Sequence, residues 1–482
     1  MNLSYLIKGI DFEGDIADCN IESINYDSRK VKEGSLFFAI KGINVDGNNF
    51  IEEAIDNGAV AVITENRLQK LIDIPIIQVK FAREVMSKVC SRFYKNPSKN
   101  INIMGTTGTN GKTSVTHILH HIITSHNESC GSLGTLGFQI PSGIINTGFT
   151  TPESVELHQM LNTLKNAQIK NLVMEVSSHA LELYRVNDID IDIAIFTNLT
   201  SEHLDFHGDM ESYLNSKIKL FQSLNNQKFA IINLDDPYFE DIKKSTKAKV
   251  VTYGFHKDAD IAVADCLFSI NGIIASLKFD QNYISINTNL IGDYNLSNIM
   301  AAVSASLCKG FSIKTIEQAI NTLPPIPGRM ERIPSECPGQ VFIDYAHTPD
   351  AYEKVFSSIS SIVNDNTKII SLFGCGGNRD KKNRSKVAKI SEHYSDYSFV
   401  TTDNPRNENI NNINQDIIKG FTNNNFKIIT NRKEAIELAL SQMQDDYVLL
   451  ILGKGRENYQ EVCGKKQFHS DIEIIRDYSY AS

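Results

Sequence analysis

A glycine-rich loop near residue 110 contains the residues with the clearest chemistry in this sequence. It reads Gly105-Thr106-Thr107-Gly108-Thr109-Asn110-Gly111-Lys112-Thr113, between the apolar run 101–104 and an amphipathic stretch that begins at residue 114. This strand, loop and helix context is typical of a phosphate-binding loop, in which glycines let backbone N–H groups approach phosphate oxygens. Lys112 would add a positive charge, and the Thr113 hydroxyl could bind Mg²⁺. The predicted ligand is ATP or GTP.

The loop departs at one position from the pattern G-x-x-x-x-G-K-[ST]. A match that ends at Thr113 requires glycine at position 106, where the chain has Thr106, and Gly105 comes one residue too early. A chance glycine turn is the competing interpretation. The predicted strand and helix on either side favour nucleotide binding.

Other polar residues follow apolar strands downstream. Glu175 lies in the apolar run 172–176, and a carboxylate there could bind Mg²⁺ unless it faces solvent from an edge strand. The loop 197–208 contains His203, and the helix predicted after it contains Lys217. Taken alone, these two are equally compatible with a hydrogen-bonding histidine and a solvated lysine.

The composition narrows the class of protein. The chain has 482 residues and a net charge of −9, which argues against broad nucleic-acid binding. Its eight cysteines include no C-x-x-C pair, so neither disulfides nor a zinc site are expected. There is no signal peptide pattern and no long uncharged apolar run that could span a membrane. We therefore expect a soluble protein of the cytoplasm with reduced thiols.

The pattern of apolar runs predicts three regions. The first ends in the helix end and linker at residues 93–99. A proline cluster at residues 323–328 cannot continue a helix or a central strand, so the third region begins near residue 333.

Alternating strands and helices predict an α/β fold in all three regions. In the first, residues 50–57 resemble a helix and residues 59–64 and 74–79 resemble strands. In the second, strands at 172–176, 191–197 and 229–233 predict a mostly parallel sheet. In the third, strands at 341–345, 369–373, 398–402, 427–430 and 448–452 predict a doubly wound, Rossmann-like sheet.

Several motifs, taken together, resemble the Mur ligases over essentially the whole chain. The glycine loop is followed by Glu175-Val176-Ser177-Ser178-His179, by Asn198-Leu199-Thr200 and by His203-Leu204-Asp205. Further matches are Asp27-Ser28-Arg29, Thr150-Thr151-Pro152, Gly292-Asp293-Tyr294-Asn295, Gly328-Arg329-Met330-Glu331 and the segment from Asp344-Tyr345-Ala346-His347 to Asp350.

The resemblance implies three domains: residues 1–98 for the UDP-sugar, 99–332 as the P-loop ATPase domain, and 333–482 as a Rossmann-like domain for the amino acid. The implied activity is ATP-dependent addition of meso-diaminopimelate to UDP-N-acetylmuramoyl-L-alanyl-D-glutamate through an acyl phosphate, in peptidoglycan precursor synthesis. The implied cofactors are ATP and Mg²⁺, the partners are these small molecules, and we expect a monomer.

The same resemblance implies roles for individual residues. Lys112, His203 and Lys217 would be catalytic, with Lys217 carbamylated so that it offers an anionic oxygen to a metal. The expected metal ligands are Thr113, Glu175, His203 and Lys217. The expected ATP contacts are Gly108, Thr109, Asn110, Gly111, Lys112, Thr113, Asn295, Arg329 and Asp344. The expected UDP-sugar contacts are Ser28, Thr150, Thr151, Ser177 and Arg185.

The choice of amino acid depends on the segment Asp403-Asn404-Pro405-Arg406. Arginine can bind a carboxylate through two hydrogen bonds, and diaminopimelate has a second carboxylate that lysine lacks. The resemblance adds Arg379, Gly453 and Glu457 to this acceptor set. A plain turn is the alternative interpretation of Asp403 to Arg406.

Two positions differ from the residues usual in the family. Leu183 stands where glutamine is common, which removes one expected polar contact with the substrate. Arg456 stands where histidine is common, which adds a positive charge beside Glu457.

Three other functions remain open from the sequence. The first is the L-lysine-adding ligase of the same family, and the second is a folylpolyglutamate synthase-like ligase, against which residues 27–29 and 403–406 argue. The third is a regulatory ATPase that does not ligate, because fold alone does not determine function.

Overall fold

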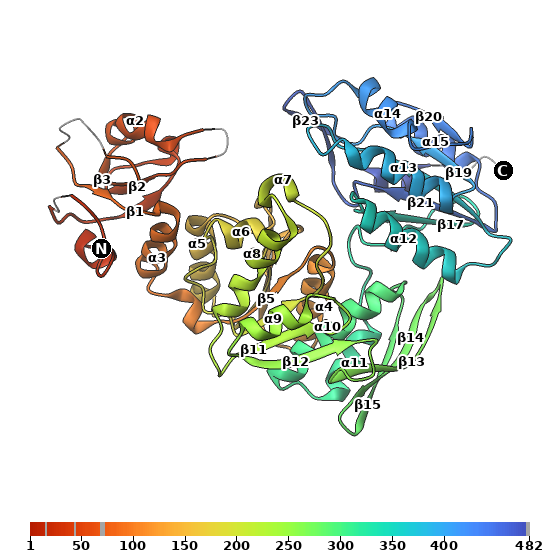
Figure 1. Cartoon of the computed structure of the whole chain (residues 1–482), viewed down its shortest axis with the longest axis horizontal. Coiled ribbons are helices and arrows are strands. Elements are labelled where there is room, and N and C mark those ends of the chain that lie inside the picture. The colour runs from red at the N-terminus through yellow and green to blue at the C-terminus, as the bar shows by residue number, and fades with distance from the viewer. Residues whose placement is uncertain (15–16, 43–44, 68–72, 479–482) are drawn as a thin grey trace. The chain divides into compact units, whose positions relative to one another are not determined.

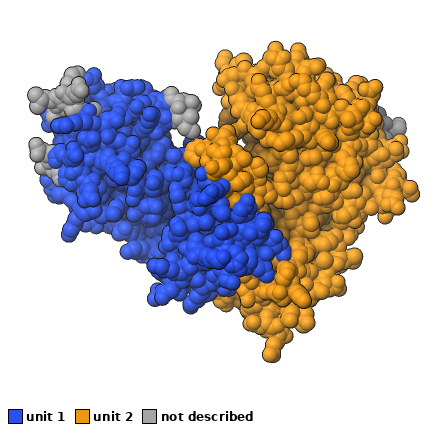
Figure 2. Space-filling view, in the orientation of Figure 1, with its two compact units in different colours: residues 1–108, 119–197, 211–251 blue, residues 109–118, 198–210, 252–482 orange. Residues whose placement is uncertain are grey.

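The computed structural model describes residues 1–14, 17–42, 45–67 and 73–478. The chain divides into two compact units. Unit 1 contains residues 1–108, 119–197 and 211–251, and unit 2 contains residues 109–118, 198–210 and 252–482 (Figure 2). Each unit is described by itself below.

The N-terminal part of unit 1 is a four-stranded parallel sheet with helices against it (Figure 1). Its strands, in spatial order, are β1 (Ser23–Asn25), β2 (Ser35–Ala39), β3 (Ala59–Thr64) and β4 (Ile76–Gln78). Its helices are α1 (Leu3–Leu6), α2 (Ile51–Asp56) and α3 (Ala82–Phe93). Leu36 and Phe38 of β2 pack into one core, whereas Phe37 and Ala39 pack into another. Because side chains alternate along a strand, β2 is buried on both faces.

The rest of unit 1 continues with a second, mostly parallel sheet. Its strands are β5 (Asn102–Thr107), β6 (Cys130–Gly134), β7 (Gly137–Ile140), β8 (Gly143–Ile145), β9 (Asn171–Glu175), β10 (Ile193–Phe196) and β11 (Phe229–Asn233). Strands β11, β10, β5, β9 and β6 are parallel neighbours in this order, and β7 and β8 follow antiparallel. The helices of this stretch of chain are α4 (Lys112–Ser125), α5 (Ser154–Asn166), α6 (Ser178–Glu182), α8 (Met210–Gln222) and α9 (Phe239–Ser245). The carboxyl ends of β5, β9 and β10 therefore lie at one edge of the sheet.

Unit 2 contains an antiparallel segment that the sequence analysis does not predict. It consists of β13 (Ile261–Ser269), β14 (Gly272–Phe279) and β15 (Asn282–Thr288). Before it, β12 (Lys249–Gly254), whose residues 252–254 belong to this unit, pairs parallel with β13. Strand β13 pairs antiparallel with β14, and β14 pairs antiparallel with β15. The helices nearby in the sequence are α7 (Leu204–His207), α10 (Asp293–Lys309) and α11 (Ile313–Asn321).

The C-terminal part of unit 2 is a six-stranded sheet in the order β16-β17-β21-β18-β19-β20. Its strands are β16 (Glu331–Arg332), β17 (Gln340–Asp344), β18 (Lys368–Phe373), β19 (Tyr397–Val400), β20 (Phe426–Ile428) and β21 (Tyr447–Leu452). Its helices are α12 (Pro349–Ile362), α13 (Lys382–Tyr394), α14 (Ile410–Ile418), α15 (Arg432–Ser441) and α16 (Asp471–Asp477), and a hairpin of β22 (Tyr459–Val462) and β23 (Lys465–Phe468) precedes α16. All pairings from β17 to β20 are parallel, as predicted.

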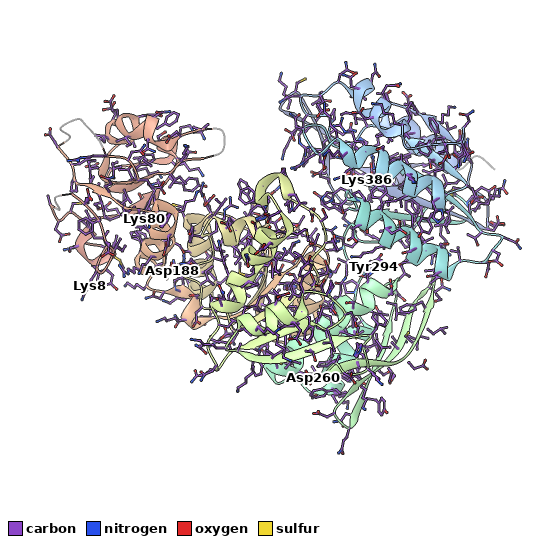
Figure 3. The ribbon with its side chains drawn as sticks, in the orientation of Figure 1. Lys8, Lys80, Asp188, Asp260, Tyr294 and Lys386 are labelled. Carbon is purple, nitrogen blue, oxygen red and sulfur yellow. The ribbon has the colours of Figure 1, made fainter. Side chains whose placement is uncertain are left out.

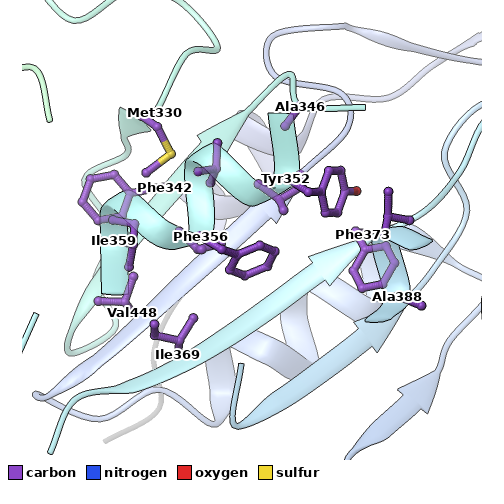
Figure 4. Packing of buried hydrophobic residues seen from close by; sticks show 14 of the residues in the cluster. Met330, Phe342, Ala346, Tyr352, Phe356, Ile359, Ile369, Phe373, Ala388 and Val448 are labelled. Carbon is purple, nitrogen blue, oxygen red and sulfur yellow. The ribbon is translucent and has the colours of Figure 1, made fainter. Parts of the chain in front are cut away.

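This sheet is buried on both faces. Phe342, Val448 and Leu450 pack with α12, α13 and α14, as Figure 4 shows around Tyr352 and Phe356. Their chain neighbours Val341 and Leu449 pack on the other face with α15 and α16. This double burial explains why the strands are continuous apolar runs, and it confirms the predicted α/β fold with mostly parallel sheets.

Two predictions from composition can be compared with the structure. All eight cysteines are free, as expected. Among the described residues, no helix is long and apolar enough to cross a membrane.

Candidate active site

The glycine loop connects β5 to α4 and forms a tight turn. Strand β5 ends at Thr107 and α4 begins at Lys112. Gly111 has φ +87°, a conformation that favours glycine, and Gly108 has φ +152°. Gly105 lies inside β5, where an added Cβ would be 3.1 Å from Val176 Cγ2. The early glycine therefore serves close packing within the sheet, which accounts for the departure from the strict loop pattern.

The segment that begins at Asn198 holds this loop. The Thr109 N–H donates to the Asn198 carbonyl at 2.8 Å, and the Asn110 N–H donates to Asn198 Oδ1 at 2.9 Å. The Thr200 N–H donates in return to Thr109 Oγ1 at 2.9 Å. Lys112 Nζ donates to the Thr109 carbonyl at 2.7 Å. The loop is thus held by hydrogen bonds in the described structure, with its lysine folded over it.

Asp350, at the start of α12, is shared between three donors. Its Oδ2 accepts from Asn110 Nδ2 at 2.6 Å, from Thr200 Oγ1 at 3.1 Å and from Lys354 Nζ at 2.9 Å. Asp350 is absent from the predicted site residues, although it lies in the matched segment that begins at Asp344. A carboxylate in the first turn of a helix is a signal that sequence analysis could have used.

Arg329 lies beside the first residues of α4. Its Nη2 donates to Thr113 Oγ1 at 3.1 Å, and its guanidinium lies over the Tyr345 ring, 4.8 Å from the ring centroid. Two predicted nucleotide contacts, Arg329 and Thr113, are therefore direct neighbours.

Asp344 and Asn295 are buried and bonded within the protein. Asp344 accepts the N–H groups of Met330 at 2.6 Å and Ala346 at 2.7 Å. Burial raises the pKa of Asp344, against the opposing effect of Arg329 and these N–H groups. Asn295 Nδ2 donates to the Ile291 carbonyl at 2.8 Å, next to Tyr294, which is labelled in Figure 3. In the described contacts, Asp344 holds the backbone next to Arg329, and Asn295 holds the backbone at the start of α10.

His203 lies in a cluster with Glu202 and His347. Glu202 Oε1 is 3.5 Å from His347 Nε2 and 3.7 Å from His203 Nε2. Burial opposes ionisation of Glu202, but the hydrogen bond and charge of His347, and the charge of His203, lower its pKa to about 2. Glu202 is thus ionised at neutral pH. The sequence analysis names His203 alone, although Glu202 is its neighbour in the chain.

Glu175 lies at the carboxyl end of β9 in unit 1. Its Oε1 accepts the Thr135 N–H at 2.8 Å, and its Oε2 accepts from Thr135 Oγ1 at 3.3 Å. The buried carboxylate packs against Gly134, where an added Cβ would collide with Oε1. Lys217 of α8 is also buried, with Nζ 4.3 Å from the centroid of the Tyr213 ring.

The expected metal ligands can be compared with the chemistry of Mg²⁺. Among the described residues, no group of three or more His, Cys, Asp and Glu is arranged to hold a metal ion. Mg²⁺ is usually bound by one or two carboxylates together with phosphates and water. A buried carboxylate such as Glu175 and a hydroxyl such as Thr113 supply hard oxygen ligands of this kind. The residues present therefore fit Mg²⁺ that arrives with a nucleotide.

The predicted UDP-sugar residues are brought together around Thr151, with the exception of Ser28. Thr151 Oγ1 donates to the Glu175 carbonyl at 2.8 Å and accepts the Ser177 N–H at 3.1 Å. Arg185 Nη1 donates to the Thr151 carbonyl at 2.9 Å. Thr150 Oγ1 is 3.3 Å from Thr135 Oγ1, the hydroxyl that contacts Glu175. Ser28 instead donates to Glu53 Oε2 at 3.1 Å in the N-terminal part.

Glu153 is a further member of this group that the sequence analysis missed. Its Oε1 is 2.9 Å from Arg185 Nη2 and 2.8 Å from Arg83 Nη1, and the side chain is buried. It directly follows the matched segment Thr150-Thr151-Pro152 in the chain. Glu153 orients the guanidinium of Arg185.

The predicted acceptor residues gather at the carboxyl edge of the C-terminal sheet. Gly453 follows β21, Arg379 lies in the loop after β18, and Asp403 follows β19, so three neighbouring parallel strands deliver them to one edge. Gly453, with φ +105°, would bring an added Cβ within 2.5 Å of Asp403 Oδ2. Ligands of parallel sheets bind at this edge.

Glu457 and Asn404 form a buried cluster with Lys454. Lys454 Nζ donates to Glu457 Oε2 at 2.7 Å, and Asn404 Nδ2 donates to the same oxygen at 2.7 Å. Burial opposes ionisation of Glu457, but the charge of Lys454 and the hydrogen bonds from Lys454, Asn404 and Tyr459 together hold the pKa of Glu457 below its usual range. Lys454 is fully buried and was not predicted, although it lies between the predicted residues Gly453 and Glu457.

The two predicted arginines lie near Gly376 in the loop after β18. An added Cβ at Gly376 would be 2.9 Å from Arg406 Nη1 and 3.6 Å from Arg379 Cγ. Arg406 Nη1 donates to the Gly377 carbonyl at 2.8 Å, and its Nε is 3.3 Å from Glu461 Oε2. Pro405 is bonded within the same loop, since its carbonyl accepts the Glu408 N–H at 3.0 Å. Arginine side chains suit a carboxylate ligand.

Arg456, one of the two unusual positions, does not contact Glu457 in the described contacts. Its Nε donates to Glu331 Oε2 at 2.8 Å, and its Nη2 contacts Glu331 Oε1. The extra positive charge expected beside Glu457 is therefore matched by Glu331. The sequence analysis missed this because the two residues are far apart in the chain.

Three family models match the chain in succession. They are described as Mur ligase family, catalytic domain, for residues 20–94, Mur ligase middle domain for residues 106–306, and Mur ligase, glutamate ligase domain, for residues 328–455. The chain belongs to the Mur ligase family.

Individual relatives are similar over nearly the whole length. The chain is 38% identical over 481 residues to the UDP-N-acetylmuramoyl-L-alanyl-D-glutamate–2,6-diaminopimelate ligase of Caldanaerobacter subterraneus subsp. tengcongensis, covering 99% of this chain and 98% of that protein. It is 37% identical over 478 residues to the ligase of the same name from Aquifex aeolicus, covering 99% and 95%. A solved structure of a ligase of this name superposes with a TM-score of 0.72 at 31% identity and covers 99% of both chains.

The comparisons bear on the expected three domains. The matched ranges 20–94 and 106–306 fall inside the predicted domains 1–98 and 99–332, whereas the range 328–455 begins before residue 333, the predicted start of the third domain. The three-domain architecture is thus confirmed, whereas the domain boundaries remain a prediction.

Proposed function

We propose that this chain is an ATP-dependent ligase that adds meso-diaminopimelate to UDP-N-acetylmuramoyl-L-alanyl-D-glutamate in peptidoglycan precursor synthesis. The observation that carries the proposal is similarity over 99% of the chain to ligases named for this reaction. The arrangement of the C-terminal loops supports the choice of acceptor. As a member of such a family, the protein acts on small molecules.

The nucleotide is assigned to the glycine loop. Gly108, Thr109, Asn110, Gly111, Lys112 and Thr113 would surround the phosphates, with Lys112 and Arg329 as cations. The loop turns into the N-terminus of α4, an end at which backbone N–H groups and the helix dipole favour anions. Asn295 and Asp344 are assigned to ATP as well, and Asp344 would also fix the backbone next to Arg329 by accepting the Met330 N–H.

We assign Mg²⁺ to Thr113, Glu175, His203 and Lys217, with Lys217 as its carbamate. The buried Glu175 carboxylate and the Thr113 hydroxyl fit this role by their chemistry. When bound, Mg²⁺ would neutralise charge on the phosphates. Carbamylation would replace the ammonium of Lys217 by an anionic oxygen donor.

The UDP-sugar dipeptide is assigned to Ser28, Thr150, Thr151, Ser177 and Arg185. Arg185 is held by Glu153 and by the Thr151 carbonyl, so its guanidinium is fixed in direction before substrate arrives. A cation held in this way suits a carboxylate or phosphate of the substrate.

The amino acid is assigned to Arg379, Asp403, Asn404, Pro405, Arg406, Gly453 and Glu457. Diaminopimelate carries two ammonium and two carboxylate groups. The loops offer both signs of charge, with Arg379 and Arg406 near Gly376, and Glu457 and Asp403 next to the residues of the turn after β21. Lysine would leave the arginine pair without its carboxylate, which favours diaminopimelate.

The reaction follows from the weak electrophilicity of a carboxylate. The D-glutamyl side-chain carboxylate attacks the γ-phosphorus of ATP, which yields an acyl phosphate and ADP. The neutral amine of diaminopimelate then attacks the acyl carbon, phosphate leaves with the C–O bond pair, and the nitrogen releases a proton. Lys112 and Arg329 would stabilise charge on the transferred phosphoryl group, and the acceptor loops would position the amine.

Phosphate release provides the test. The purified protein is incubated with ATP, Mg²⁺ and UDP-N-acetylmuramoyl-L-alanyl-D-glutamate, and meso-diaminopimelate is compared with L-lysine, with the product identified by mass. We expect a product heavier by one diaminopimelate residue and a strong preference over lysine. A preference for lysine would retain the ligase and refute the acceptor assignment. Phosphate release that needs no amino acid would favour a regulatory ATPase instead, and turnover only with a folate and glutamate would favour the folylpolyglutamate synthase-like ligase.

The remaining expectations are proposals of the same kind. We infer that the protein works in the cytoplasm, as a monomer and without nucleic acid. The net charge of −9 supports the absence of nucleic acid, and the nucleotide-sugar substrate supports the cytoplasmic location.

A further inference from the structure

We propose that Arg456 is a positioning residue that fixes the loop of residues 453–457, which carries the acceptor contact Glu457, against the segment of residues 328–331, which carries the nucleotide contact Arg329. The inference rests on the proposed function, because it concerns how two of the proposed contacts are held at a set distance. Arg456 itself is not expected to touch either substrate.

The contact between the two segments is a two-point ion pair. Both carboxylate oxygens of Glu331 are used by Arg456, through Nε and Nη2. Glu331 Oε2 also accepts the Gly328 N–H at 2.8 Å. Glu331 is 4% exposed, so its charge depends on these donors. The guanidinium plane fixes direction as well as distance, which a single-point contact would not do.

The backbones of the two segments touch directly beneath this pair. An added Cβ at Gly328 would be 2.8 Å from the Arg456 backbone nitrogen, and one at Gly455 would be 3.0 Å from the Gly328 carbonyl oxygen. Both glycines have positive φ, +67° and +51°. Since no side chain fits between them, a shift of one segment must displace the other.

Each segment carries a proposed substrate contact within two residues of the ion pair. Arg329, next to Gly328, donates to Thr113 Oγ1. Glu457, next to Arg456, is held by Lys454 and Asn404. Loss of the Arg456 pair would therefore free the acceptor loop first, because Arg329 keeps its contacts with Thr113 and Tyr345.

The side chain of Arg456 also lies outside the hydrophobic core, since it is 44% exposed. Its replacement creates no core cavity, and we expect Arg456→Met to fold. Arg332 is a matched control, because it is an exposed arginine on β16 directly after Glu331. Arg332→Met also removes one positive charge, here from the strand that carries Glu331.

The test compares steady-state constants for each substrate in wild type, Arg456→Met, Arg332→Met, Glu331→Gln and the double variant Arg456→Met/Glu331→Gln. In Arg456→Met, we expect KM for diaminopimelate to rise about tenfold, with KM for ATP and kcat within about threefold of wild type, the tenfold change corresponding to about 1.4 kcal/mol. Arg332→Met should match wild type. Adding Arg456→Met to Glu331→Gln should change KM for diaminopimelate by less than about twofold, since the partner is already altered.

The outcomes separate this inference from the proposed function. Equal rises in KM for ATP and diaminopimelate, additive effects in the double variant, or an unchanged KM in Arg456→Met would each overturn the positioning role while wild-type ligation stands. A wild-type protein that shows no diaminopimelate-dependent turnover would overturn the proposed function and the inference together. If Arg456→Met melts well below Arg332→Met, a purely structural role replaces the proposal.

Discussion

Residues 109–113 of the glycine loop and the acceptor-side loops, all within unit 2, hold their cations in different ways. Lys112 and Arg329 are described in contact with neutral groups, namely the Thr109 carbonyl, the Thr113 hydroxyl and the Tyr345 ring. In the acceptor loops three cations are paired with carboxylates: Lys454 with Glu457, Arg406 with Glu461 and Arg456 with Glu331.

This difference matches the charge of the two proposed ligands. A triphosphate is a concentrated anion, so the positive charges of Lys112 and Arg329 suit it. Diaminopimelate has two positive and two negative groups, so a site of matched charges can exchange one partner for each of them. The comparison predicts that substitutions in the glycine loop lower catalysis, whereas substitutions in the acceptor-side loops weaken amino-acid binding or lower stability.

The largest effect is expected at the glycine loop. Lys112→Met should lower kcat for ligation by about 10³-fold, because charge on the transferred phosphoryl group loses its nearest lysine. Phosphate release and product mass measure this, and an unchanged thermal melt shows that the loop still folds. Lys244→Met on α9, an exposed lysine, is the control. Full activity in Lys112→Met would remove the loop from the chemistry and break the comparison.

The next effect is expected in the buried acceptor pair. Lys454→Met should lower the free energy of unfolding by about 3 kcal/mol at pH 7, since Glu457 keeps a buried charge without its cation, and Lys454→Met/Glu457→Gln should recover most of that loss. Urea denaturation of the three proteins gives the comparison. Equal stability of the single and double variants would show that the charge pair is unimportant.

This prediction has a definite pH dependence. The pKa of Glu457 lies below its usual value of 4.5 in the folded protein, so the pair contributes stability above the unfolded value and loses it as pH falls through the lowered pKa. The difference between wild type and Lys454→Met should therefore be largest near neutral pH and shrink below about pH 4. A difference that grows in acid would contradict the assigned cause.

A smaller effect is expected at the arginine near Gly376. Arg406→Lys keeps the charge but loses the planar two-point contact, so KM for diaminopimelate should rise about tenfold and KM for ATP should stay unchanged. Initial rates with each substrate varied in turn supply the measurement. Lys427→Arg on β20 is a control of the reverse exchange at an exposed position. A rise in KM for ATP alone would place Arg406 on the nucleotide side.

The smallest effect is expected from the loss of the Thr200 hydroxyl. Thr200→Val removes the hydroxyl that donates to Asp350 but keeps the side-chain shape, and it should cost about 1 kcal/mol in stability with kcat lowered only a few-fold. Thermal melting and phosphate release measure the two quantities. A loss of stability as large as that of Lys454→Met would show that this hydroxyl hydrogen bond matters as much as the ion pair between Lys454 and Glu457.

Strand positions were predictable where both faces of a sheet are buried. The runs 59–64 and 229–233 coincide with β3 and β11, and the C-terminal strands differ from prediction by at most two residues at each end. The antiparallel strands β13 to β15 were not predicted, because one of their faces is exposed and their apolar residues alternate, as in the burial of β15. That alternation is a strand signal which the search for continuous runs passed over.

Site residues were predictable when they lie in or beside a local motif. The acceptor residues Asp403 and Gly453 do lie at one edge of one sheet, as expected from strands that all run parallel. Their partners were harder to predict. Lys454 and Glu202 lie next to the predicted residues Gly453 and His203 but lack a chemical signature of their own. Glu331 and Arg456 are separated by over a hundred residues.

The sequence by itself determined the family, the α/β class and the positions of the glycine loop and acceptor segments, since each depends on residues adjacent in the chain or on strand periodicity. Only the tertiary structure decided which charge meets which. It pairs Arg456 with Glu331 and not with Glu457, and it places Gly105 in a strand and not in the loop. The physical reason is that ion pairing and close packing depend on distances across the fold, which chain order does not contain.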